Sequence, residues 1–127
     1  MGTFLLIGMG GFLGAIMRYL LGNYVQNWSK ISDFPIGTLV VNLVGCSLIG
    51  ALAQLAEIRD IFTPETSSLI FLGFLGAFTT FSTFSSDSFN LFQEGNSLLF
   101  YLNIGASVIF GLFAVWLGRT IVSLVSA

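Results

Sequence analysis

Four long apolar stretches dominate this sequence, and they decide which environment the chain has to fold in. They cover residues 4–21, 35–56, 68–92 and 98–122. Each approaches or exceeds the roughly 20 apolar residues that a helix needs to cross a hydrocarbon layer about 30 Å thick. The segments between them are short and polar. We therefore expect an all-α membrane protein with four transmembrane helices that form a single domain, residues 1–127.

The charge content supports the same conclusion. Only 8% of the 127 residues are charged and 55% are hydrophobic, whereas about 25% of the residues of an ordinary soluble domain are charged. No basic residue precedes the first apolar stretch, so we expect the first span to be retained rather than removed as a signal peptide. Pro35 and Pro64 lie near the expected starts of the second and third helices, where a missing backbone N–H costs least.

The reactive side chains exclude several classes of protein. The chain has no histidine and a single cysteine, Cys46. Zinc, haem and iron–sulfur sites are therefore not expected, and no internal disulfide can form. No nucleophile stands beside a general base, so an enzyme is not expected either.

Positive charges are divided evenly between the two sides of the membrane. With four spans, Arg59 and Arg119 fall on one side, whereas Arg18 and Lys30 fall on the other. Insertion direction follows the Lys/Arg asymmetry of short loops, so a chain without asymmetry is able to insert both ways. Two oppositely inserted copies can pair about a twofold axis in the membrane plane. The count leaves open an antiparallel homodimer of dual topology and a single orientation set by one dominant loop charge.

Small residues on three of the spans permit close contacts between helices. They are Gly10, Gly14, Gly45, Gly50, Gly105, Gly111, Ala114 and Gly118. Because glycine is frequent in membrane helices in general, packing within one subunit remains the alternative to packing between two.

The stretch GAFTTFSTFSSD, residues 76–87, interrupts the third apolar segment. Within ten positions there are seven hydroxyl residues, namely Thr79, Thr80, Ser82, Thr83, Ser85, Ser86 and Ser88. One hydroxyl can bond to the preceding helical turn and so be accommodated in lipid, but seven exceed that need. Together with Gly73 and Gly76, they predict that the third helix is broken near its middle, between residues 76 and 80.

A helix break at membrane depth is tolerated only where it is buried in protein or faces a water-filled cavity. Carbonyl groups freed by the break can hold a small monovalent cation, and the N–H groups of the half-helix that begins there can face an anion. The sequence therefore predicts an ion site or an ion pathway beside the third helix.

The polar residues favour an anion as the transported ion. Asp87 is the only carboxylate that is a candidate for membrane depth, because the others lie at helix ends or in loops. Positive-ended groups are more numerous and include Arg18 and the amides of Asn42 and Asn103. A small drug exporter would need a carboxylate in its first span, where this chain has Arg18. A membrane scaffold without transport gives no reason for the hydroxyl cluster.

Phenylalanines recur every three residues through the same cluster, at Phe78, Phe81 and Phe84. The edge of an aromatic ring carries the positive part of its quadrupole, so Phe81 and Phe84 can contact an anion edge-on. The alternative is that these rings only fill apolar space, as most phenylalanines in membrane helices do.

Three motifs, in this order, resemble the Fluc family of fluoride channels. They are GGFLGAIMRY at residues 10–19, PIGTLVVNLVG at 35–45, and GFLGAFTTFSTF at 73–84 followed by Asp87. The resemblance implies an antiparallel, dual-topology homodimer in the inner (plasma) membrane of a microbe. Such a dimer exports fluoride passively from the cytoplasm through two pores, each built from both subunits.

The resemblance also implies roles for individual residues. Phe81 and Phe84 would line each pore with their ring edges, and the amide of Asn42 would donate to the ion. Arg18 would draw anions into an aqueous vestibule. Hydroxyl groups would continue the polar path, and these belong to Ser82, Thr83, Tyr101 and Ser107; the last two lie in the fourth span, which matches the family more loosely.

Cofactors and partners are implied by the same resemblance. A structural sodium ion at the dimer centre would be held by the backbone carbonyls of Gly76 and Thr79, two from each subunit. The expected partners are fluoride, a second copy of the chain and the lipid bilayer. Neither an organic cofactor nor a nucleic acid is expected.

Overall fold

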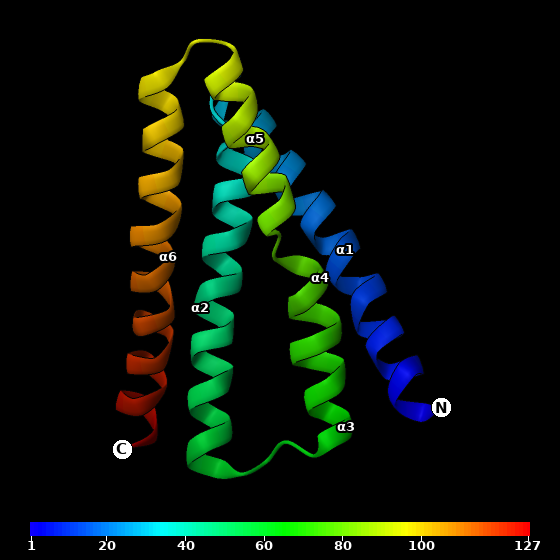
Figure 1. The fold of residues 1–127 in the computed structure, drawn as a ribbon. Helices are drawn as coiled ribbons and strands as arrows, with labels where there is room; N and C mark the ends of the chain where they lie inside the picture. The colour runs from blue at the N-terminus through cyan, green and yellow to red at the C-terminus, as the bar shows by residue number, and fades with distance from the viewer.

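The computed structural model describes residues 1–127, and all of its regular structure is helical (Figure 1). Three helices are continuous: α1 (Gly2–Ser29), α2 (Ile36–Arg59) and α6 (Ser97–Ser126). The remaining span is built from four pieces, which are α3 (Pro64–Ser67), the π-helix η1 (Ser68–Leu75), α4 (Gly76–Phe78) and α5 (Phe81–Gln93). Four helical segments are long and apolar enough to cross a membrane, which confirms the predicted number of spans.

The first helix is longer than predicted. It continues through residues 22–29, beyond the end of the first apolar stretch, and it ends only at Lys30, whose φ of 55° is left-handed. No proline and no glycine after Gly22 interrupt this segment. The side chain of Gln26 also ties the end of α1 to the start of α2, because it bonds to the carbonyl of Phe34 at 3.1 Å and to the amide of Gly37 at 3.0 Å.

The helices form two closely packed pairs. In Figure 1, α6 runs beside α2, and α1 passes next to the broken span with its N-terminus splayed outward. The backbones approach so closely that a Cβ atom at Gly118 would overlap the carbonyl oxygen of Ser47. A Cβ atom at Gly14 would likewise overlap the carbonyl oxygen of Phe74. At these glycines, packing within one subunit is the alternative that the structure confirms, whereas Gly105 has no neighbour within 4 Å of such an atom.

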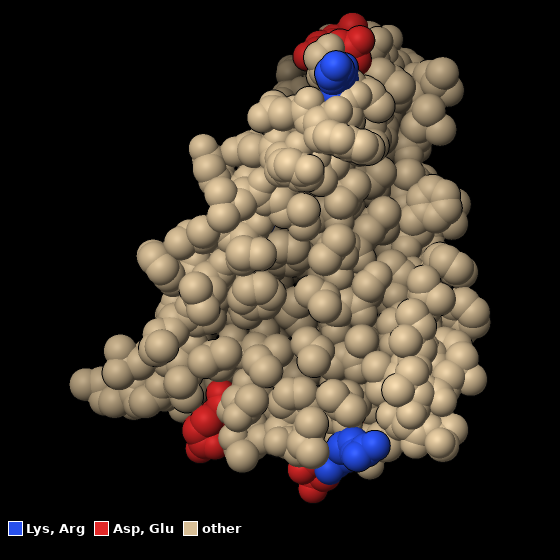
Figure 2. Space-filling view, turned by 180° about the vertical axis from the view of Figure 1, so that it is seen from behind, with Lys and Arg blue, Asp and Glu red and all other residues tan.

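The outer surface suits a lipid environment. Only 15 of 127 residues are buried, and most of the large apolar side chains face outward. Charged side chains in Figure 2 gather at the two ends of the molecule, and a wide band without charge separates them on that face. At one end, Arg119 of α6 and Glu57 of α2 form an ion pair with an N–O distance of 2.5 Å. The apolar band therefore faces lipid or a further protein subunit.

Candidate functional site

The third span is broken at two threonines. Thr79 and Thr80 have extended backbones, with φ and ψ of −82° and 153° and of −150° and 116°. This confirms the break predicted between residues 76 and 80, but Gly76 itself remains helical. The β-branched threonines suit an extended backbone. Thr80 also starts the next helix, because its hydroxyl accepts a bond from the amide of Thr83 at 3.2 Å.

The helix before the break is a π-helix, which the sequence did not indicate. Eight residues of π-helix are unusual, since this geometry occurs mostly as single widened turns and often at functional sites. Its backbone lies directly against α1: a Cβ atom at Gly10 would overlap the carbonyl oxygen of Leu69, and one at Gly73 would lie 2.7 Å from that of Ile7. The two glycines therefore let η1 pack directly against the backbone of α1.

Asn42 of α2 bridges the break with both ends of its amide. Its Nδ2 donates to the carbonyl oxygen of Thr80 at 3.1 Å, and its Oδ1 accepts from the amide of Thr80 at 2.9 Å. The side chain thus replaces the helical hydrogen bonds that Thr80 has lost. An amide group has two N–H donors, so Asn42 has a second N–H in addition to the one bound to Thr80.

Backbone carbonyls lose their usual partners at the same place. In a continuous helix, the carbonyls of Gly76 and Thr79 would accept bonds from the amides of Thr80 and Thr83. Those amides bond instead to the side chains of Asn42 and Thr80. The carbonyl oxygens of Gly76 and Thr79 are therefore among those that the break leaves without the amides that a continuous helix would supply.

A groove of about 410 Å³ lies beside the break, and we call it the aromatic groove. Two of its three phenylalanines, Phe81 and Phe84, have ring centres 5.6 Å apart with planes tilted by 46°, and Phe81 is 78% exposed. Six residues with predicted roles line this groove, namely Asn42, Gly76, Thr79, Phe81, Phe84 and Ser107. The structure thus brings together residues from α2, from both sides of the break and from α6.

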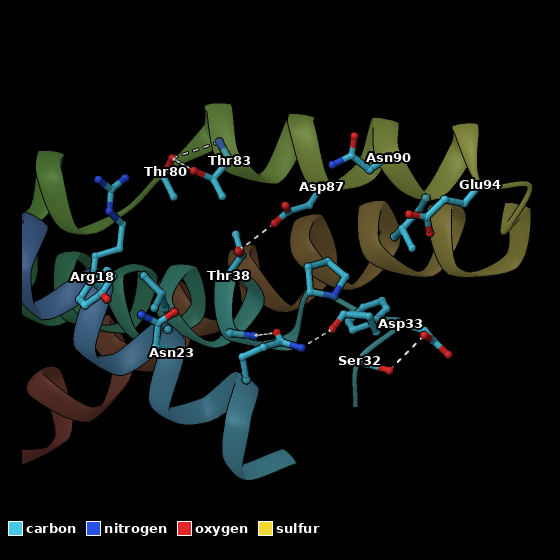
Figure 3. Close-up of a pocket in the computed structure, with 18 residues that line it drawn as sticks. Arg18, Asn23, Ser32, Asp33, Thr38, Thr80, Thr83, Asp87, Asn90 and Glu94 are labelled. Carbon is cyan, nitrogen blue, oxygen red and sulfur yellow. Dashed lines mark hydrogen bonds between the residues drawn. The ribbon is translucent and has the colours of Figure 1, made fainter. Parts of the chain in front are cut away.

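A second hollow, the polar cavity, has a volume of about 600 Å³ and also reaches the break, where Thr80 lines it (Figure 3). Arg18 of α1 lines it together with Thr83 of α5, and both had predicted roles. Asp87 points from α5 toward Thr38 of α2, whose hydroxyl donates to the carboxylate at 2.9 Å (Figure 3). The cavity thus combines one guanidinium with hydroxyl, amide and carboxylate groups.

Two residues with predicted roles lie outside both hollows. Ser82 is exposed, with its Oγ 3.3 Å from that of Thr80. Tyr101 is 68% exposed, and its ring packs against Phe100 with a centre distance of 5.1 Å. Their assignment to the ion path remains a prediction.

Sequence reasoning missed two residues that the structure places at the site. Thr80 is the one residue that lines both the aromatic groove and the polar cavity. Thr38 holds Asp87 in place. A signal for Thr38 was present, because it precedes Asn42 by four residues and so shares its face of α2. Asn103, in contrast, lines neither hollow and is buried.

Comparison with known proteins identifies relatives over nearly the whole chain. Residues 5–119 match the family model described as CrcB-like protein, Camphor Resistance (CrcB). A protein of Methanosarcina acetivorans named fluoride-specific ion channel FluC 1 is 49% identical over 117 residues, which cover 92% of this chain and 88% of that one. The fluoride-specific ion channel FluC of Campylobacter lari is 47% identical over 119 residues, covering 92% and 94%.

These matches include all four spans and the break between Thr79 and Thr80. The identities are far above those at which only a fold is shared. The family model extends over all the residues that line both hollows. The chain belongs to the CrcB family.

Proposed function

We propose that this protein is a fluoride-selective channel that lets fluoride leave the cytoplasm passively across the plasma membrane of a microbe. The observation that carries the proposal is the aromatic groove, where Asn42, Phe81 and Phe84 meet beside an unwound membrane helix. Relatives named as fluoride-specific channels support the choice of ion. The chain is not an enzyme, because its family is one of ion channels.

The chemistry of the groove suits a small, strongly hydrated anion. The second N–H of the Asn42 amide, the hydroxyl of Ser107 and the edges of the phenylalanine rings are neutral groups with their positive ends available. Conduction requires sites that bind well enough to replace water yet release the ion quickly. Neutral donors meet both needs, whereas a lysine or arginine at the narrowest point would hold fluoride too tightly.

The polar cavity would serve as the aqueous entrance to this path. Arg18 supplies the positive charge that attracts an anion, and Thr80 and Thr83 supply hydroxyls where the cavity meets the break. Three carboxylates line the same cavity, Asp33, Asp87 and Glu94, and they oppose this attraction. The hydrogen bond from Thr38 orients the Asp87 carboxylate but does not remove its charge, so the pull of Arg18 would act locally, near the break. Fluoride would pass from the cavity past Thr80 to Asn42 and the rings.

A second copy of the chain would complete the pores. One subunit leaves the aromatic groove open, with Phe81 largely exposed, so an enclosed path needs another surface. The even division of positive charge supports insertion in both orientations. Two inverted copies would form an antiparallel homodimer with one groove for each of two pores.

A structural sodium ion would fit at the centre of this dimer. The carbonyls of Gly76 and Thr79 have lost their helical partners, and unwound backbone carbonyls are known sodium ligands in membrane proteins. Two copies would supply four such oxygens. Bound there, the ion would satisfy those oxygens and raise the positive potential near the pores.

Ion efflux from liposomes that contain only this protein tests the proposal. We expect rapid release of fluoride and little release of chloride, followed with ion-selective electrodes. A small drug exporter of dual topology is the alternative function, and it would instead exchange organic cations for protons. Saturable, pH-driven uptake of such cations without fluoride release would contradict the channel proposal.

A further inference from the structure

The half-helix α5 carries the phenylalanines of the groove, yet little holds it to the rest of the subunit. Of its 13 residues, only Ser88 and Leu91 are buried. The extended Thr79 and Thr80 separate it from α4, so it does not inherit the direction of the preceding helix. Its orientation therefore depends on the few contacts along its buried face.

A chain of buried hydrogen bonds joins that face to α6. Asn103 is 2% exposed, and its Nδ2 donates to the Oγ of Ser88 at 2.9 Å. Ser88 is 5% exposed and donates in turn to the carbonyl oxygen of Phe84 at 2.8 Å. A buried amide without a hydrogen-bond partner costs free energy, so a movement of α5 that breaks the bond between Asn103 and Ser88 is unfavourable. The two bonds therefore fix the position of Ser88, and of the backbone of Phe84, relative to α6.

The residue next to Ser88 ties the same half-helix to a different neighbour. Asp87 accepts a hydrogen bond from Thr38 of α2, on the side of the polar cavity. Two adjacent side chains thus attach α5 to α2 and to α6. Removal of the Asn103 bond would take away the buried polar contact with α6 and leave the half-helix held by Asp87 and, at its start, by the bonds between Asn42 and Thr80. The part of α5 that carries Phe84 would then be held less firmly.

We infer that Asn103 is a positioning residue of the pore, which acts through Ser88 to set the place of Phe84. The inference rests on the proposed channel function. Chloride is larger and less strongly hydrated than fluoride, so a pore whose rings are held less firmly discriminates less between them. Loss of the Asn103 bond should therefore lower selectivity for fluoride over chloride, and should do so without any change in a residue that lines the path.

Three variants test this inference: Asn103→Leu, Ser88→Ala and the double variant. Hydrogen exchange of the backbone amides of residues 81–93 reports how firmly α5 is held, and liposome efflux gives the ratio of fluoride to chloride release. We expect faster exchange and a ratio lowered by about threefold to thirtyfold in each single variant, the range of hydrogen bonds between membrane helices. Because both substitutions break the same contact, the double variant should lose little more than either one.

Two further variants serve as controls. Ser47→Ala removes a hydroxyl that donates to the carbonyl of Leu43 at 3.0 Å within α2 and bonds to no other helix, so it should change neither measurement. Ser88→Thr keeps the hydroxyl and should retain the wild-type ratio. If Asn103→Leu does not assemble, the pair Ser88→Ala and Ser88→Thr carries the test.

The two measurements separate the outcomes. Faster exchange with an unchanged ratio would show that Asn103 holds the fold only, and would overturn the positioning role. Unchanged exchange and an unchanged ratio would overturn it as well. A wild-type protein that releases no fluoride would refute the channel function and with it any role in selectivity, while exchange in the variants would still show whether the Asn103 bond holds α5.

Discussion

At the scale of single residues, Asn42 combines two tasks in one side chain. Its amide holds Thr80 at 2.9 Å and 3.1 Å and so fixes the break, and it also lines the groove. The chemistry of the residues indicated that Asn42, Phe81 and Phe84 could contact an anion, and the family resemblance assigned them roles in the pore. The sequence could not predict the bonds of Asn42 to Thr80 or of Thr38 to Asp87, because such contacts depend on how two helices are rotated against each other.

Replacement of Asn42 by aspartate tests this double role. The new carboxylate would still accept from the Thr80 amide, but it would lose the donor to the Thr80 carbonyl and place negative charge beside the anion path. We expect fluoride efflux to fall by at least about 100-fold, since one buried charge contact is worth about 3 kcal/mol or more. Asn96→Asp, in the turn before α6, is the matched control and should leave efflux unchanged. Full efflux in the Asn42→Asp protein would remove Asn42 from the pathway.

The ring edges of the groove can be tested in the same assay. Phe81→Ile and Phe84→Ile keep an apolar side chain but remove the quadrupole, so each should lower fluoride efflux about fivefold, as expected for an aromatic contact of about 1 kcal/mol. Phe89→Ile is the control, because Phe89 is 57% exposed on α5 and does not line the groove. Equal efflux in all three variants would show that the rings are apolar filler.

At the scale of helices, the broken third span was predicted and the π-helix before it was not. The hydroxyl cluster of residues 79–88 predicted the break, because an excess of polar side chains within an apolar span can be seen directly in the sequence. The π-helix, Ser68–Leu75, has no such signal, since its sequence SLIFLGFL is typical of an ordinary membrane helix. The segment packs closely against the backbone of α1, and a contact of that kind cannot be deduced from the segment alone.

Substitution of Gly14 tests the contact between α1 and the broken span. A Cβ atom in Gly14→Ala would overlap the carbonyl oxygen of Phe74, so the two helices would have to separate. We expect the free energy of unfolding to fall by about 1–3 kcal/mol, the usual cost of overpacking. Thermal unfolding in detergent measures it. Gly105→Ala, where nothing lies within 4 Å, should unfold at the wild-type temperature or slightly above, and equal loss in both variants would argue against the close contact.

At the scale of the whole molecule, the sequence predicted four spans and the structure has them. Long apolar runs are a dependable signal because the thickness of the bilayer fixes their length. The first helix extends beyond its predicted end. The prediction missed this extension because it followed apolar residues, and the last turns of the helix are polar. The number of subunits and their directions depend on contacts between chains, so they stay predictions.

Cysteine labelling tests the predicted dual topology. In a Cys46→Ser background, a cysteine at Gly95 or at Ile61 would report on opposite ends of the molecule. We expect a membrane-impermeant thiol reagent, added to intact cells, to label about half of the chains at each position, because the positive charges are evenly divided. Complete labelling at one position and none at the other would establish a single orientation and exclude the antiparallel dimer.

The open side of the aromatic groove has a consequence for how conduction begins. A lone chain gives fluoride no enclosed route, because Phe81 and its neighbours face outward along the side of the subunit. If the proposed antiparallel dimer forms the pores, newly inserted copies would stay electrically silent until two of opposite orientation meet. When the protein is highly diluted in lipid, the fluoride flux across the bilayer should then rise with the square of the number of chains per unit of membrane area, rather than in proportion to that number.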